Sequence, residues 1–173
     1  MANFTFLKDD PQYSSFAGAC IDAEAGLDKS PNACIKLVRT ALEASIKWVY
    51  KKDRKFNKPD EVNLFTLMNE PSFQNSVGKN LIEKLHTCRK MGNQAIHNEK
   101  TFNVKEAEQC LSNLFDFVQW IDKTYGKNHR KRTFDSGEIP AEDSTLVKIL
   151  KGAALVGAGA LAAIFINKNN DEH

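Results

Sequence analysis

The sequence lacks the cysteine and histidine arrangements that bind metals or form disulfide frameworks. Its four cysteines, at positions 20, 34, 88 and 110, are far apart, and no two of them form a CxxC pair. The polar start MANFTFLKDD carries no secretory signal. We therefore expect reduced thiols in an intracellular protein, with no bound metal.

Several other features of enzymes and nucleic-acid binders are missing. There is no glycine-rich phosphate loop and no serine in a nucleophile-elbow motif, so the sequence indicates no cofactor. The 24 Lys and Arg residues nearly balance the 22 Asp and Glu residues, which gives a net charge of +2. A protein covered in positive charge for nucleic-acid binding is not indicated, and we expect any basic surface to be local.

The apolar residues that are present follow a helical period. No run alternates with period two over a useful length, so we predict no sheet. Residues 1–126 are predicted to form an all-α, up-and-down bundle of four to five helices. The expected helices run from Pro11 to Ala25, from Pro31 to about Lys52, from Asp60 to about Asn69, from about Asn80 to His97 and from Asn103 to Tyr125.

The composition changes after the bundle. Residues 127–145 read as a basic linker, residues 146–166 are apolar on all sides, and residues 167–173 form a polar tail. A membrane-spanning helix needs about 20 apolar residues, which the segment 146–166 supplies if Lys148 and Lys151 extend toward lipid head groups. We predict a transmembrane helix here; the alternative is a soluble hydrophobic helix that docks on a partner or on the bundle.

The flanking charges predict an orientation. Basic residues are concentrated before the apolar segment, whereas Asp171 and Glu172 follow it. The positive-inside rule places the bundle on the cytoplasmic face of the inner cell membrane, as a single-pass protein. We expect the basic run 127–132 to be mainly solvated, with an added attraction to anionic lipid.

Small residues in the apolar segment favour self-association, because they let helices pack closely in lipid. We therefore expect a homodimer or a higher oligomer. The residues assigned to the membrane anchor are Lys148, Lys151, Gly152, Gly157, Gly159 and Phe165.

One helix carries residues that suit catalysis. Arg89, Asn93 and His97 follow one another at four-residue steps, and His86 lies seven residues before Asn93 on the same flank. An arginine that holds a phosphate and a histidine that moves protons suit metal-independent cleavage of RNA through attack by the 2′-hydroxyl.

A structural interpretation of the same residues is favoured. Arg89 would pair with a carboxylate from another helix, and Glu24 is the candidate partner because it lies on an apolar stripe. Arg39 is the rival partner. Alternatively, Arg39 and Glu43 form an ordinary exposed pair at helical spacing.

Several segments together resemble a known family. They are FLKDDPQY near the start, Ala23-Glu24, LVRTALE at 37–43, RKMGNQAIH at 89–97 and Gln119-Trp120. They resemble the bacterial helical domain of unknown function that occurs alone and at the N-terminus of type I restriction endonuclease R subunits. That family looks related to the HEPN superfamily of helical bundles, many of which act in RNA cleavage and antiviral defence, often as dimers.

The resemblance implies a function, but the sequence departs from the pattern of the HEPN nucleases at two points. HEPN nucleases use an Arg and a His separated by four to six residues, whereas seven residues separate Arg89 from His97 here, and Lys90 follows the arginine. We therefore expect a non-catalytic interaction or sensing module in bacterial defence or stress, with an unknown protein partner. A HEPN-like ribonuclease acting on RNA and a small oligomeric membrane effector are the alternatives.

Overall fold

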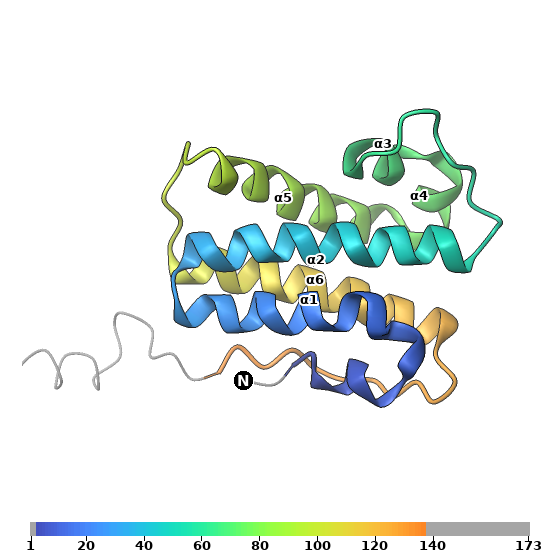
Figure 1. The fold of residues 1–173 in the computed structure, drawn as a ribbon, viewed down its shortest axis with the longest axis horizontal. Helices are drawn as coiled ribbons and strands as arrows, with labels where there is room; N and C mark the ends of the chain where they lie inside the picture. Colours follow the sequence, from blue (N-terminus) through green and yellow to red (C-terminus); the bar gives the residue numbers. More distant parts are fainter. Residues whose placement is uncertain (1–2, 138–173) are drawn as a thin grey trace, which may run out of the picture. The chain divides into compact units, whose positions relative to one another are not determined.

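The computed structural model describes residues 3–137, which are helical wherever they form regular structure (Figure 1). The helices are α1 (Ser14–Ala25), α2 (Pro31–Lys52), α3 (Leu64–Asn69), α4 (Pro71–Val77), α5 (Lys79–Ile96) and α6 (Val104–Tyr125). Three short 3-10 turns accompany them: η1 (Thr5–Asp9), η2 (Pro11–Tyr13) and η3 (Gly26–Asp28). Because these residues contain no strand, the all-α prediction is confirmed for this part of the chain.

Capping residues explain where most helices begin. The Ser30 hydroxyl accepts a hydrogen bond from the backbone N–H of Ala33 at 3.1 Å, directly before Pro31. Asn103 and Glu106 form a reciprocal capping box at the start of α6. In the same way Asn63 caps α3, so this helix begins at Leu64 and not at the predicted Asp60.

The segment between Pro71 and Gly78, which the sequence leaves undefined, is the short helix α4. The Glu70 carboxylate caps this helix by accepting a hydrogen bond from the backbone N–H of Phe73 at 3.0 Å. Gly78 then has a φ of 90°, a conformation that side chains with a Cβ rarely adopt, and it separates α4 from α5.

The long helix α2 lies at the centre of the bundle and packs against α1, α5 and α6 (Figure 1). Ile35, Val38, Leu42 and Ile46 on α2 are fully buried, and helices on both sides contribute to the same core. All four cysteines are free and buried. Burial raises the pKa of Cys20 to about 12, so this thiol is protonated and unreactive at neutral pH.

Residues 127–136, here called the strap, do not leave the bundle directly. Figure 1 shows this segment, in orange, running back from the end of α6 toward the N-terminal residues. The backbone N–H of Arg132 donates to the Gln119 side chain at 3.1 Å, and the ring of Phe134 lies 5.7 Å from that of Phe115. The compact unit accordingly extends to Ser136, beyond the predicted boundary at residue 126.

The strap has only some of the properties of the predicted basic linker. Lys127, Arg130 and Lys131 are exposed, as in a solvated linker. His129 and Arg132, in contrast, bind a carboxylate of α6.

The helices formed by residues 3–137 include none that is both long and apolar enough to cross a membrane. The predicted membrane helix 146–166, its anchor residues and the polar tail 167–173 lie outside the described residues.

Candidate functional site

The structure gives different surroundings to the three residues proposed for catalysis. Arg89 is half-buried, and its guanidinium lies over the ring of Phe65, 5.0 Å from the ring centre. Asn93 is also half-buried, and its side-chain oxygen accepts a hydrogen bond from Arg39 Nε at 2.8 Å. His97 follows the last residue of α5 and is exposed. Arg89 lines a surface pocket to which neither Asn93 nor His97 contributes.

Asn93 belongs to a joint between α2 and α5. The Arg39 side chain crosses α5 at Gly92, where an added Cβ would lie 2.5 Å from Arg39 Cβ. Beyond this crossing, Arg39 Nε reaches Asn93, and Arg39 Nη1 lies 3.6 Å from a Glu43 oxygen. The predicted pair between Arg39 and Glu43 is therefore present, and it belongs to the joint that holds the two helices together.

The predicted pair between Glu24 and Arg89 is wrong. The Glu24 carboxylate accepts hydrogen bonds from the backbone N–H of Asn3 at 3.0 Å and from its side-chain amide at 2.7 Å. The N-terminal segment folds back over the end of α1, so these two donors satisfy the carboxylate without a guanidinium. Arg89 faces α3 instead.

The Arg89 pocket, as we call it, is a shallow depression of about 440 Å3 on α5 beside α3. Its lining residues are Phe65, Glu83, His86, Thr87, Arg89 and Lys90. Phe65 is 52% exposed, and the centre of its ring lies 6.4 Å from that of His86. Arg89 Nε is buried without a hydrogen-bond acceptor in the described structure. Burial and the neighbouring charges of Arg89 and Lys90 lower the pKa of His86, so its imidazole is mostly neutral at pH 7.

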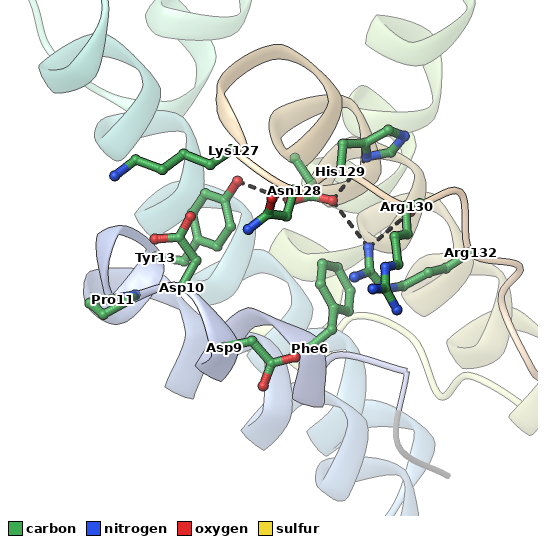
Figure 2. Close-up of a pocket in the computed structure, with 11 residues that line it drawn as sticks. Phe6, Asp9, Asp10, Pro11, Tyr13, Lys127, Asn128, His129, Arg130 and Arg132 are labelled. Atoms are coloured by element: carbon green, nitrogen blue, oxygen red, sulfur yellow. Dashed lines mark hydrogen bonds and ion pairs between the residues drawn. The ribbon is translucent and has the colours of Figure 1, made fainter.

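A second depression, of about 670 Å3, lies between the strap and the N-terminal turns η1 and η2. Asp122 of α6 is buried at its base and accepts hydrogen bonds from Tyr13 Oη at 3.0 Å and Arg132 Nη1 at 3.1 Å, and it lies 2.9 Å from His129 Nδ1. Figure 2 shows these three side chains converging on one carboxylate, while Lys127 points away from them. The groups that could bind a ligand are thus largely used to hold the strap.

Burial and the hydrogen bond to Asp122 raise the pKa of Tyr13, so its hydroxyl remains a donor throughout the physiological range. Within residues 3–137, no three His, Cys, Asp or Glu side chains are grouped so that they could hold a metal ion.

Sequence reasoning missed Phe65 and Asp122. Neither lies in a recognisable motif: Phe65 contacts Arg89 of another helix, and Asp122 binds His129 and Arg132 of the strap, which no helical spacing connects to it. The spacing of three residues between His86 and Arg89 is close to one helical turn, and it is the signal in the sequence that these two side chains share a face.

A family model described as "Domain of unknown function (DUF4145)" matches residues 22–148. The chain belongs to this family. No curated protein and no solved structure matches the chain. The matched range begins within α1 and continues through the strap, so the strap is part of the DUF4145 domain and is not an appendage to it.

Proposed function

We propose that this DUF4145 chain is a non-catalytic interaction module, held at the cytoplasmic face of the cell membrane by residues 146–166. The observation that supports binding is the Arg89 pocket, where a guanidinium that forms no ion pair with a carboxylate of residues 3–137 lies on an exposed aromatic ring. The other two residues of the suspected catalytic set lie elsewhere, one in the helix joint and one beyond the end of α5.

The biological setting is proposed from the sequence resemblance. Similarity to the restriction-associated domain and to HEPN bundles supports a role in bacterial defence or stress, in a dimer or higher oligomer. In that role the bundle binds a protein partner, while the apolar segment determines the location.

An RNA cleavage assay tests the absence of catalysis. Full-length protein, purified in detergent, is incubated with total RNA in the presence of EDTA, alongside Arg89→Ala and His97→Ala. We expect no cleavage above the level of a protein-free control. Cleavage that is lost in either variant would refute the proposal.

A metal-independent ribonuclease is the second candidate, and one observation favours it. Neutral His86 and Arg89 line the same pocket, so an imidazole that accepts the 2′-hydroxyl proton would lie beside a guanidinium that stabilises the phosphate. His86→Ala is therefore included in the assay. Cleavage that depends on His86 but not on His97 would support a ribonuclease built differently from the one that the sequence suggests.

A further inference from the structure

We propose that the Arg89 pocket binds a carboxylate side chain of a protein partner, while an apolar side chain of the same partner packs on Phe65. This inference rests on the proposed interaction function and names the chemistry of its partner.

The state of Arg89 is the first argument. The other half-buried arginines of the described fold are paired: Arg39 with Glu43, and Arg132 with Asp122. Arg89 has the Phe65 ring on one side, and no carboxylate among residues 3–137 forms an ion pair with it. Its buried Nε has lost water without gaining an acceptor. The terminal nitrogens form no ion pair among residues 3–137 either, and a partner's carboxylate would fit them through paired hydrogen bonds.

Exposed apolar surface is the second argument. Phe65 and Val62 are 52% and 55% exposed, and both lie at or just before α3. Large apolar side chains that stay in contact with water beside a charged pocket are typical of a surface that a partner covers. An aliphatic side chain on the free part of the Phe65 ring would remove that apolar area from water.

The Arg89 pocket borders a second depression on α5. A neighbouring depression of about 500 Å3 shares Glu83 and His86 with the Arg89 pocket and continues along α5 to Gly78. Asn75 lines this continuation and offers its side-chain amide to a peptide backbone, whereas Gln74 Nε2 donates to the Met68 carbonyl and leaves the amide oxygen of Gln74 as an acceptor.

The local charge favours a peptide over a nucleic acid. Arg89 and Lys90 are the cations that line the Arg89 pocket, and Lys79 adds one cation to its continuation; Glu83, which lines both, opposes them, and His86 is mostly neutral. A phosphate backbone requires a row of cations, whereas a single carboxylate requires one guanidinium. The pocket therefore suits one acid group next to an apolar residue.

Binding of designed peptides tests the proposal. A fluorescein-labelled peptide, Gly-Leu-Glu-Leu-Asp-Leu-Gly, is titrated with full-length protein in detergent micelles and followed by anisotropy. The matched peptide carries Gln and Asn in place of the two acids. We expect Arg89→Gln to weaken binding of the acidic peptide about tenfold or more, because it removes a charge-assisted hydrogen-bond pair. The control Arg54→Gln removes an equal charge from an exposed loop residue and should leave binding unchanged.

A second readout is specific to the pocket. A bound carboxylate opposes the charges of Arg89 and Lys90, so the acidic peptide should raise the pKa of His86 in an NMR titration, whereas the Gln/Asn peptide should not. Circular dichroism of Arg89→Gln establishes that the variant is folded.

The outcomes separate the possible occupants. No binding by the wild type at millimolar concentration, or equal binding by wild type and Arg89→Gln, overturns the proposal. So does Arg89-dependent binding of a seven-nucleotide RNA more tightly than the acidic peptide, or self-association that Arg89→Gln abolishes. These results differ from RNA cleavage, which would refute the interaction function itself.

Discussion

Gly92 is the residue of α5 against which the Arg39 side chain of α2 packs. A methyl group at this position would overlap the Cβ, Cγ and Cδ atoms of Arg39, so the helices would have to separate or the arginine would have to leave Asn93. We expect Gly92→Ala to lower the free energy of unfolding by about 1–3 kcal/mol, although alanine favours a helix. Urea denaturation measures this change.

A matched control exists in α1. A Cβ at Gly18 meets no atom within 4 Å, so Gly18→Ala should be neutral or stabilising by up to about 1 kcal/mol. If both variants behave alike, the close crossing at Gly92 has no energetic consequence.

The carboxyl group of Glu108 on α6 predicts that the stability of the fold depends on pH. One of its side-chain oxygens is buried without a hydrogen-bond partner in the described structure, and burial raises its pKa. A carboxyl group whose pKa is higher in the folded protein than in the unfolded chain binds its proton more tightly in the folded protein. Such a group lowers the free energy of unfolding as the pH rises above its pKa in the unfolded chain. We expect Glu108→Gln to stabilise the protein by about 1 kcal/mol at pH 7.

The stabilisation by Glu108→Gln should shrink as the pH falls toward 4, where the native carboxyl group is itself protonated. Chemical denaturation at several pH values gives this difference. A pH-independent effect would contradict the explanation, and Glu83→Gln, at an exposed position, is the control.

For single residues, the contacts that the sequence could not predict are those between residues far apart in the chain. The pair between Arg39 and Glu43 follows from helical spacing and was foreseen. The partner of Glu24 was not, because Asn3 reaches it only after the N-terminal segment has folded back. Likewise, no spacing rule connects Arg89 with Phe65, since they lie on different helices.

Helices with strong end signals were predictable. Ser30-Pro31 and the capping box at Asn103 mark α2 and α6 within a residue or so of their observed starts. The helices α3 and α4 are too short to contain an apolar period of useful length. The sequence therefore predicts α3 with a start four residues too early, at Asp60, and leaves α4 undefined.

The attachment of the strap to the bundle is the feature of the fold that the sequence predicts least well. Its residues are polar and show no period, so composition alone predicts a solvated linker. Its attachment depends on Asp122, Phe115 and Gln119. These residues lie on one face of α6 only once that helix has formed.

Asp122→Asn should release the strap. The substitution removes the charge that binds His129 and Arg132, whose side chains are 30% and 28% exposed, and we expect a loss of about 1–3 kcal/mol in the free energy of unfolding. Trypsin should then cleave faster at the basic residues of the strap, as followed by mass spectrometry.

Asp116→Asn is the control for the strap, because it removes an α6 carboxylate from an exposed pair with Lys84. That variant should keep the wild-type cleavage rate and stability within about 0.5 kcal/mol. Equal cleavage rates for wild type and Asp122→Asn would show that the strap is held by other contacts.

For the whole molecule, the proposal divides the chain into a binding bundle and a membrane segment. Fractionation of cells that express a tagged protein, with and without residues 146–173, measures this division. We expect the full chain to sediment with membranes and to be extracted by detergent but not by high salt, because apolar burial in lipid is insensitive to screening.

The shortened chain should remain in the supernatant. Extraction of the full chain by salt alone would indicate that basic residues, and not an apolar segment, determine its location. A full chain that stays soluble without detergent would contradict the membrane assignment.

The double hydrogen bond between Asn3 and Asp135 brings the two ends of the described fold together: the Asn3 amide donates to the Asp135 carbonyl, and the Asp135 backbone N–H donates to the Asn3 side chain, both at 2.8 Å. A short peptide joining these ends would close the domain into a ring without bending any helix. New termini placed in the exposed loop at Asn57-Lys58 should then give a circular permutant with the same bundle, because chain order matters less than the contacts it produces.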